Sequence, residues 1–243
     1  MDFFDRQWSS YRAIVEHNLM EHRQVAEATA AAIEGWLAAR PENAPAPTMV
    51  DLGCGDLAQL APLLRRLPLG SYTGLDLAEV VLPLAERALG PVPYPTTWQH
   101  GDLLAWAQGR LEPGPGPHRS AAGCDIIHSA FAIHHLDDQH KQEFLQAARE
   151  RINPGGLLLW VDIFREPGED RSEYVQRYRQ RIARDWQVLS AEQQTHVVDH
   201  LSSFDLPADR DRITGTAEAA GWRWQWAWQG AHRAEALAVL TPI

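Results

Sequence analysis

Cysteine and long apolar runs are both scarce in this chain. Only two of the 243 residues are cysteine, Cys54 and Cys124. They are read as small buried residues of a reducing compartment, because a disulfide framework needs more. No apolar stretch approaches the roughly 20 residues that cross a bilayer, and residues 1–6 do not resemble a signal peptide. We therefore expect a cytoplasmic protein with no membrane partner.

Positive charge is also in short supply. The chain has 22 lysines and arginines against 32 aspartates and glutamates, a formal net charge of −10. The arginines between positions 177 and 184 are surrounded by acidic residues, so no basic stripe forms. Nucleic-acid phosphates would be repelled by such a surface, and we expect no nucleic-acid partner.

A glycine-containing turn follows the first predicted strand. Residues 50–56 read Val-Asp-Leu-Gly-Cys-Gly-Asp, after a break rich in proline and alanine, and before a helix-like run at 57–67. Gly53 and Gly55 would let a ligand approach the backbone amides closely, because a Cβ there would block it. A tight turn without a ligand is the alternative, since a lone Gly-x-Gly is a weak signal.

Two more acidic residues close short apolar runs at similar intervals. Asp76 lies 25 residues after Asp51, and Asp102 another 26 residues on. In doubly wound sheets, an acid at the end of the second strand accepts hydrogen bonds from a ribose diol. Asp102 is placed to accept from an adenine amine, with Leu77 and Leu103 against the ring faces. Three acids in register at strand ends indicate a nucleotide site.

With these motifs in place, the chain resembles the class I S-adenosylmethionine-dependent methyltransferases. The resemblance extends from about Val50 to Phe164. It rests on five segments, in order Asp51-Leu52-Gly53-Cys54-Gly55, Gly74-Leu75-Asp76, Gly101-Asp102-Leu103, Cys124 to Leu136, and Arg151 to Leu159. One departure is Leu57, where the family often has a third glycine; it argues against a dinucleotide, whose pyrophosphate needs a roomier turn.

The resemblance implies S-adenosylmethionine as cofactor, S-adenosylhomocysteine as product, and a small-molecule acceptor. The cofactor contacts it implies come from the strand ends and from the N-terminal segment. They are Asp51, Gly53, Cys54, Gly55, Asp76, Leu77, Asp102, Leu103, His128, Ser129 and Tyr11. His17, His22 and Arg23 are further candidates for its methionine end.

The pattern of elements predicts an α/β fold in one domain over residues 1–243. Strands are expected at 48–52, 71–75, 95–99, 124–129 and 156–163, and helices at 57–67, 78–88, 102–108 and 138–151, with a Pro/Gly loop at 109–122. Alternating strands and helices imply a parallel sheet with right-handed crossovers. The resemblance makes it a Rossmann-like, seven-stranded, mostly parallel sheet with helices on both faces and an antiparallel C-terminal hairpin.

Three segments surround the predicted cofactor-binding core at 46–164. Residues 1–45 form an N-terminal helical cap, 165–211 a helical insertion that we interpret as a substrate lid, and 212–243 a C-terminal strand pair. In the last, four tryptophans at positions 222 to 228 alternate with period two, so all four are expected on one side of a strand.

Histidines after the fourth strand are the candidate acceptor-side groups. His134 is predicted as the leading general base and His135 as the second, since imidazole titrates near neutral pH. Capping of the following helix is the alternative role. A metal site made from His134, His135, Asp137 and His140 is not expected, because adjacent histidines in an irregular loop rarely converge. Tyr174, Tyr178 and His200 of the lid are the predicted substrate contacts.

The predicted activity is methyl transfer by in-line displacement, most readily to oxygen or nitrogen of a small molecule. Arsenite methylation is excluded because it needs several converging thiolates. Two other hypotheses stay open. One is a non-catalytic S-adenosylmethionine-binding or regulatory protein, and the other is a methyltransferase that acts on proteins.

Overall fold

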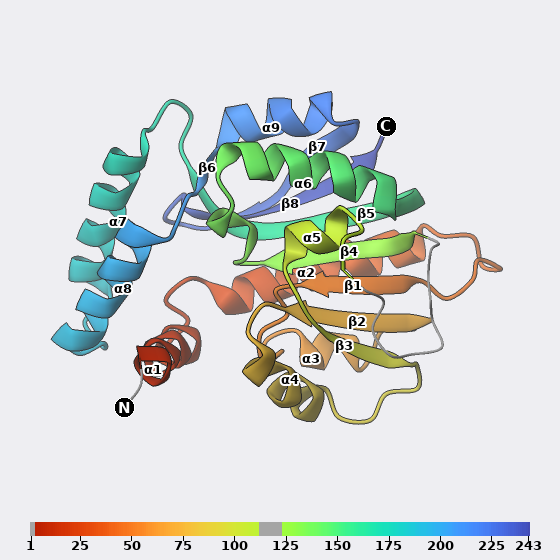
Figure 1. The fold of residues 1–243 in the computed structure, drawn as a ribbon, viewed down its shortest axis with the longest axis horizontal. Helices are drawn as coiled ribbons and strands as arrows, with labels where there is room; N and C mark the ends of the chain where they lie inside the picture. Colours follow the sequence, from red (N-terminus) through yellow and green to blue (C-terminus); the bar gives the residue numbers. More distant parts are fainter. Residues whose placement is uncertain (1–2, 112–122) are drawn as a thin grey trace.

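One mixed sheet organises the molecule (Figure 1). The computed structural model describes residues 3–111 and 123–243, with side chains from Ser10 onward. Seven longer strands lie in the order β3-β2-β1-β4-β5-β8-β7, and the two-residue β6 pairs with β5. The strands are β1 (Thr48–Leu52), β2 (Ser71–Asp76), β3 (Thr96–His100), β4 (Cys124–Ala130), β5 (Ile152–Arg165), β6 (Ala208–Asp209), β7 (Trp222–Gln229) and β8 (Glu235–Pro242).

The first five strands are parallel, and β8 runs antiparallel to β5 and β7. The predicted mostly parallel sheet with an antiparallel C-terminal hairpin is confirmed. The sheet places the carboxyl ends of β1, β2 and β4 at one edge, with β1 between the other two. Ligands bind at that edge in open α/β sheets.

Helices cover both faces. The face packed against the first core cluster carries α2 (His22–Ala38), α3 (Ala61–Leu64) and α4 (Leu82–Leu89), with the 3₁₀ turn η1 (Glu79–Val81) before α4. The opposite face carries α5 (Leu103–Ala107), α6 (Asp138–Arg151) and α9 (Arg210–Ala219). Among the described residues, no helix combines the length and apolarity needed to cross a membrane.

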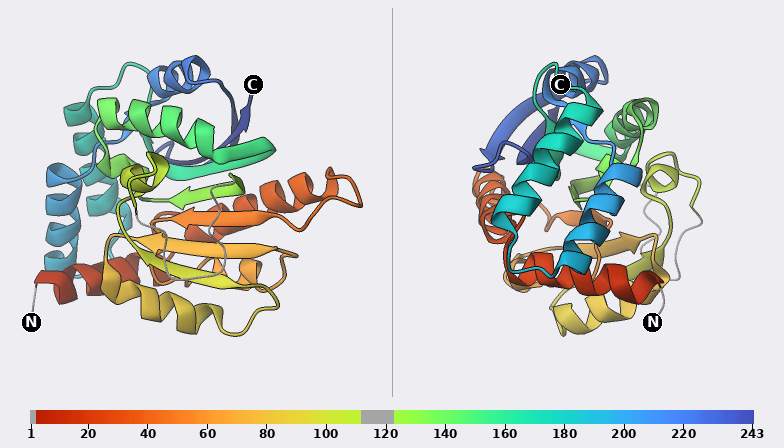
Figure 2. Two further views of the ribbon diagram at one scale, coloured as in Figure 1. Left: turned by 45° about the vertical axis from the view of Figure 1, so that its right-hand side comes forward. Right: turned by 90° about the vertical axis from the view of Figure 1, so that its left-hand side faces the viewer.

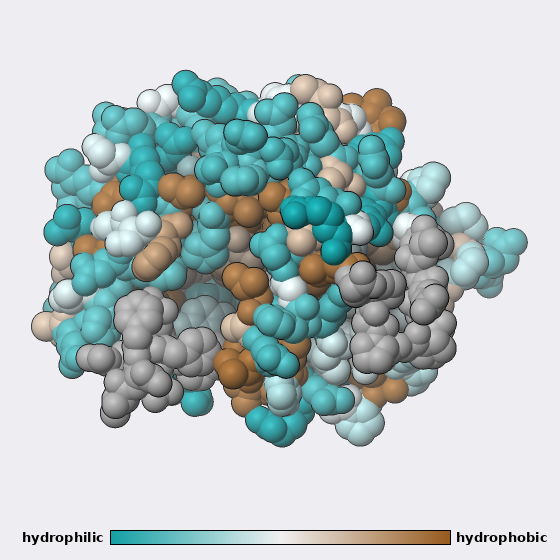
Figure 3. All heavy atoms as spheres, viewed as in Figure 1, coloured by the Kyte–Doolittle hydropathy of each residue, from teal (hydrophilic) through white to brown (hydrophobic). Residues whose placement is uncertain are grey.

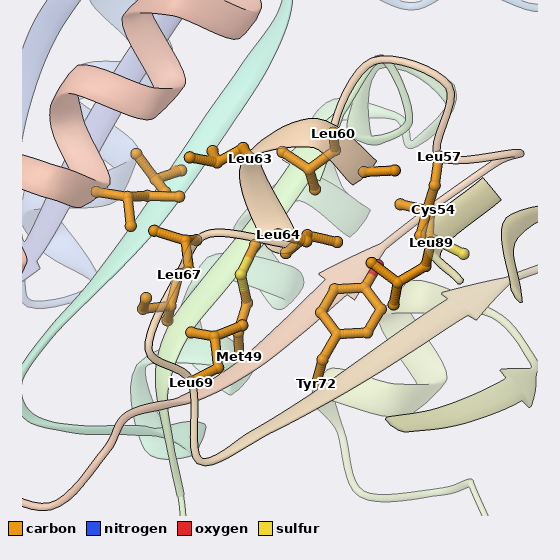
Figure 4. Close-up of a cluster of buried hydrophobic side chains, with 14 of the residues drawn as sticks. Met49, Cys54, Leu57, Leu60, Leu63, Leu64, Leu67, Leu69, Tyr72 and Leu89 are labelled. Atoms are coloured by element: carbon orange, nitrogen blue, oxygen red, sulfur yellow. The ribbon is translucent and has the colours of Figure 1, made fainter. Parts of the chain in front are cut away.

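The first core cluster explains the position of the glycine turn. Figure 4 shows leucines of the β1–α3 segment packed with Met49 and Tyr72 from the strands beneath them. Leu57, Leu63 and Leu64 are at most 4% exposed. Burying a leucine side chain stabilises a fold by about 1.5–3 kcal/mol, so this packing anchors the turn on the sheet.

Three helices lie at the carboxyl edge of the sheet. They are α1 (Phe3–Glu16), α7 (Arg171–Asp185) and α8 (Ala191–Ser203). The right-hand view of Figure 2 shows α7 and α8 side by side, with α1 crossing their lower ends. A third apolar cluster holds them together, with Ile14, Tyr178, Trp186 and Leu201 among its buried members.

Several predicted boundaries differ from the structure. The helix expected at 57–67 shortens to α3, because Leu57 has a left-handed φ of 57° and residues 57–60 form turns. The strand expected at 156–163 extends to the full length of β5. Residues 212–243 were predicted as a strand pair, yet they begin inside α9. Part of the loop expected at 109–122 lies outside the described residues.

The tryptophan row is not one-sided. Trp222, Trp224 and Trp226 belong to the core cluster on the α6 face, while Trp228 packs with the cluster on the α2 face. A register shift between Trp226 and Trp228 in the β7–β8 pairing changes the side of the sheet to which the strand directs its side chains. A bulge of this kind breaks the period-two alternation that the prediction assumed.

Candidate cofactor and acceptor site

The glycine turn is closed by its own hydrogen bonds. The amides of Gly53 and Cys54 both donate to the carbonyl of Leu75, at 2.8 and 3.0 Å. The Gly55 amide donates to Asp76 Oδ2 at 2.8 Å. The expectation that these three amides are free donors is therefore wrong. The turn instead lets a ligand come close to the backbone.

The two glycines of the turn have different surroundings. Gly53 and Gly55 have left-handed φ values of 76° and 54°, which disfavour other residues. A Cβ on Gly53 would lie 2.6 Å from the Cβ of Ala132, whereas one on Gly55 would meet nothing within 4 Å. Gly55 thus borders open space, and Gly53 is needed for packing.

That open space is a cavity of about 580 Å³. It lies at the carboxyl ends of β1 and β4, and helices α1 and α2 supply another part of its wall. Its lining includes Asp51, Gly53, Cys54, Gly55, Asp56 and His128 from the core, and Tyr11, Arg12, Val15, His22, Val25 and Thr29 from the two helices. The two N-terminal helices therefore line this cavity together with the core.

A buried carboxylate lies at the base of the cavity. Asp51 is 2% exposed. Its Oδ1 is 2.7 Å from His128 Nδ1, and its Oδ2 accepts a hydrogen bond of 2.9 Å from the Tyr72 hydroxyl. Burial and the neighbouring Asp51 raise the pKa of Tyr72 well above its usual value, so the phenol remains a donor. Asp51 is thereby fixed in position beside the glycine turn.

The predicted nucleoside contacts follow the next two strands. Asp76 ends β2, and its two oxygens accept from the amides of Gly55 and Ala78, both at 2.8 Å. Desolvation raises the pKa of Asp76, although these amides oppose the shift. Leu77 is 69% exposed, and Figure 3 shows apolar residues gathered near the start of α4 on an otherwise mostly hydrophilic face.

Asp102 and Leu103 stand at the start of α5. Asp102 is the N-cap of that helix, and its Oδ1 accepts from the Ala105 amide at 2.8 Å. Leu103 is partly buried against the second core cluster. One oxygen of Asp102 thus has a structural partner, which leaves the other for the predicted contact with an adenine amine.

Ser129 has a structural contact instead of the predicted cofactor contact. It is fully buried, and its hydroxyl donates to the Leu52 carbonyl at 2.8 Å, which joins β4 to β1. Side chains alternate along a strand, so Ser129 and its neighbour His128 point to opposite faces of β4. His128 reaches Asp51 at the cavity, and Ser129 does not line it.

The helix-derived wall contains two ionisable groups with perturbed pKa values. Desolvation and the carboxylates of Asp56 and Asp76 raise the pKa of Tyr11 to about 12, although part of its ring is exposed. Desolvation lowers the pKa of His22 to about 4. His22 is 5% exposed, and its ring lies 5.2 Å from the Phe131 ring. Its Nδ1 has no hydrogen-bond partner in the part of the chain that the structure describes. A neutral imidazole therefore borders the cavity.

The structure contradicts the general-base role predicted for His134. Its Nδ1 is 2.5 Å from Asp162 Oδ1, and its Nε2 is 3.5 Å from Asp205 Oδ1. Burial alone would lower the pKa of His134, but the two carboxylates outweigh that effect and raise it to about 10. An imidazole that already carries its proton at neutral pH cannot accept another.

His135, the second candidate base, is half-exposed and does not line the cavity. Desolvation and the charge on His134 lower its pKa to about 4. Its Nδ1 lies 3.9 Å from Asp205 Oδ1, and His200 Nε2 lies 3.3 Å from the same oxygen. The histidines at 134, 135 and 200 therefore converge on one carboxylate, at the junction between the β4–α6 loop and the lid.

The four residues considered for a metal site divide into two groups. His140 pairs with Asp137, Nδ1 to Oδ2 at 3.0 Å, and Asp137 caps α6. His134 and His135 instead lie with Asp205, the three ligand atoms being within 4.8 Å of one another. Asp137 and His140 thus have structural roles at the start of α6.

Tyr174 and Tyr178 are not placed to contact a substrate, contrary to the prediction. Both rings are buried in the cluster between α7, α8 and α1. The Tyr178 hydroxyl donates to Glu235 Oε1 at 2.7 Å, and Arg181 pairs with the same carboxylate at 2.7 Å. This buried network fixes α7 to β8. The aromatic residues of the charged helix α7 thus mark the side of that helix that packs into the core.

Sequence reasoning missed three residues of these sites. Asp162, toward the carboxyl end of β5, is 1% exposed and accepts from His134, Trp160 and Ile163. An aspartate inside an apolar strand was the available signal, because buried acids need partners. Asp205 and Arg12 carried no local signal, since only the fold brings them to the junction and to the cavity.

Comparisons with known proteins agree with this geometry. Residues 50–158 match the family model described as a methyltransferase domain. A segment of 113 residues is 33% identical to the trans-aconitate 2-methyltransferase of Azoarcus sp., covering 46% of this chain and 38% of that protein. The matched segment also spans 49% of similar mycobacterial methyltransferases, so the chain covers less than half of these curated relatives.

Two solved structures share the fold over nearly the whole chain. A methyltransferase-like protein of Haloferax volcanii, solved in complex with the Trm112 activator, has a TM-score of 0.58 at 16% identity, covering 100% of this chain and 98% of that one. CalS10, an amino pentose methyltransferase of Micromonospora echinaspora, has a TM-score of 0.56 at 18% identity, with 91% and 92% coverage. Residues 50–158 therefore match the methyltransferase-domain family, and the described chain shares its fold with these two solved structures.

Proposed function

We propose that the chain transfers a methyl group from S-adenosylmethionine to oxygen or nitrogen of a small molecule bound in the cavity beside the glycine turn. The observation that carries this proposal is that one cavity contains the turn, the buried Asp51 and the unpartnered imidazole of His22. A cofactor and an acceptor would thus be bound side by side in this one cavity.

The residues present fit the cofactor. A Cβ on Gly55 would have no atom of the described residues within 4 Å. Asp76 lies directly behind that glycine, with its carboxylate held by two amides, which suits a ribose diol. Bound S-adenosylmethionine supplies an electrophilic methyl group on a sulfonium; what this chain adds is position and exclusion of water.

On the acceptor side, we assign His22 to orient the acceptor. Its pKa of about 4 leaves the ring neutral near pH 7, so Nδ1 can accept a hydrogen bond from an acceptor hydroxyl or ammonium group. The contact with Phe131 restricts the ring's rotation. Such a group lowers the entropy cost of a productive alignment.

The size of the cavity, about 580 Å³, favours a small acceptor over a protein chain. Arg12 lies at the exposed rim and makes no ion pair with a described residue. It can therefore pair with an anionic acceptor. The names of the relatives fit this class, since one acts on trans-aconitate and another on an amino pentose.

The test is turnover of methyl-labelled S-adenosylmethionine by the purified chain in a metabolite extract, followed by mass spectrometry. Label in a small molecule, with equal formation of S-adenosylhomocysteine, supports the proposal. Cofactor binding without turnover in any extract would favour the non-catalytic hypothesis, and label found only in protein would favour a macromolecular acceptor.

A variant pair tests the acceptor side once a labelled product is known. We expect His22→Ala to lower kcat/KM for the acceptor by about 10–100-fold, with cofactor affinity nearly unchanged. His17→Ala is the matched control, because His17 is an exposed histidine on the segment just before α2 that does not line the cavity. Equal losses in both variants would remove His22 from the site.

A further inference from the structure

A second constellation lies at the junction of the β4–α6 loop with the lid. Asp205, just after α8, is 7% exposed. Three imidazole nitrogens face its Oδ1: His200 Nε2 at 3.3 Å, His134 Nε2 at 3.5 Å and His135 Nδ1 at 3.9 Å. They come from a loop and a helix more than 60 residues apart in the sequence.

These approaches do not amount to hydrogen bonds. Asp205 Oδ1 is buried and has no hydrogen-bond partner among the described residues. Leaving a buried acceptor unsatisfied is costly, so such an atom calls for an explanation. The ligand atoms of His134, His135 and Asp205 lie within 4.8 Å of one another, which is close enough to hold a metal ion. Nitrogen and oxygen ligands at about 2.0–2.1 Å from a tetrahedral zinc ion stand roughly 3.3 Å from one another.

A carboxylate behind the cluster also fits a metal site. His134 Nδ1 contacts Asp162 Oδ1 at 2.5 Å, and the Asp162 Oδ2 accepts from the His134 amide at 2.9 Å. This contact fixes the ring with Nε2 toward Asp205. Metal-binding histidines almost always use their second nitrogen in this way, because it sets the tautomer and the ring orientation.

We propose that His134 Nε2, His135 Nδ1 and Asp205 Oδ1 bind one divalent transition-metal ion of the zinc type, and that His200 Nε2, 3.3 Å from Asp205 Oδ1, turns toward the ion as the fourth ligand. Three imidazoles and a carboxylate are a suitable donor set for that class. The ion takes the place of the proton on His134 Nε2. Four protein ligands close the coordination sphere, so the ion is structural and fastens the end of α8 to the β4–α6 loop.

A proton-only network is the competing explanation, and it makes different demands on the residues. An ion pair between His134 and Asp205 needs neither His135 nor His200. A metal site needs both, because each supplies a ligand. Replacing His135 or His200, whose side chains are 45% and 40% exposed, therefore distinguishes the two explanations without disturbing the core.

The experiment uses the whole chain, treated with a chelator and then freed of it. Zn²⁺ is titrated by calorimetry, and Co²⁺ is added separately as a spectroscopic probe. We expect one equivalent of Zn²⁺, a tetrahedral Co²⁺ absorption band, and a higher Tm on loading. His135→Ala and His200→Ala should each weaken Zn²⁺ binding at least 100-fold and abolish the cobalt band.

His140→Ala is the matched control, because His140 is a half-exposed histidine that also contacts a carboxylate, nearby on α6. It should bind Zn²⁺ as the parent does. Circular dichroism checks that each variant folds. The proposal is overturned if the parent binds no stoichiometric metal, or if His135→Ala and His200→Ala bind it as tightly as the parent. No acceptor or cofactor is needed, so this result is independent of the proposed methyl transfer.

Discussion

His22 and His134 are both buried histidines, and their surroundings give them opposite charges. They are 5% and 6% exposed, and both lie near the loop after β4, where Phe131 touches the His22 ring. His22 pairs with no carboxylate of residues 10–111 or 123–243, and desolvation lowers its pKa to about 4. His134 lies between Asp162 and Asp205, which outweigh desolvation and raise its pKa to about 10.

The comparison shows that burial alone does not decide whether a histidine can act as an acceptor. Burial without a charged partner leaves a neutral ring with an available nitrogen, as at His22. Without a bound metal ion, burial between two carboxylates favours an imidazolium that serves structure, as at His134. The residue suited to the cavity is therefore the one without partners.

The largest expected effect comes from removing the main partner of His134. Asp162→Ala leaves the imidazole, the Trp160 indole and two backbone amides without their shared acceptor. Breaking a buried ion pair from one side costs about 3–5 kcal/mol. We expect the free energy of unfolding in urea, measured with a chelator present, to fall by that amount. A loss below 1 kcal/mol would show that Asp162 does not hold His134.

The next effect is the acid sensitivity caused by His22. Its pKa is about 4 in the folded chain and 6.5 in the unfolded one, so the unfolded state binds more protons between these values. Stability from the neutral ring is present above pH 6.5 and is lost as pH falls toward 4, by roughly 3 kcal/mol in all.

His22→Gln isolates this contribution, because glutamine does not titrate. Urea unfolding of parent and variant across pH 4 to 7 gives a difference in which other titrating groups cancel. We expect the parent to lose more stability than the variant on acidification. Parallel curves would mean that the His22 ring is hydrated, which would remove the contrast with His134.

A smaller effect is expected at Asp76, the carboxylate behind the glycine turn that accepts from the amides of Gly55 and Ala78. Asp76→Ala should weaken cofactor binding by about 1.5–3 kcal/mol, the contribution of a charge-assisted hydrogen bond. Glu79→Ala is the control, since Glu79 is an exposed carboxylate three residues further along. Calorimetry with S-adenosylhomocysteine measures both, and unchanged affinity in folded Asp76→Ala would remove the ribose assignment.

The sequence predicted the features that depend on local pattern. The end of β1, the acid that closes β2 and the bounds of α6 could all be read from apolar periodicity, glycine and capping residues. The chemistry of His134 could not, because Asp162 and Asp205 lie 28 and 71 residues away in the sequence. Tyr178 was misread for the same reason, since its partner Glu235 is on β8.

The smallest expected effect comes from a third imidazole–carboxylate pair, His140 with Asp137, which is half-exposed on both sides. Water solvates both groups, and exposed pairs contribute about 0–1 kcal/mol. We expect His140→Ala to change the free energy of unfolding by less than about 0.5 kcal/mol, because the Asp137 contact that caps α6 goes to a backbone amide and survives the change. If this variant loses as much stability as Asp162→Ala, measured under the same conditions, burial is not what separates the two pairs, and the charge on His134 needs another cause.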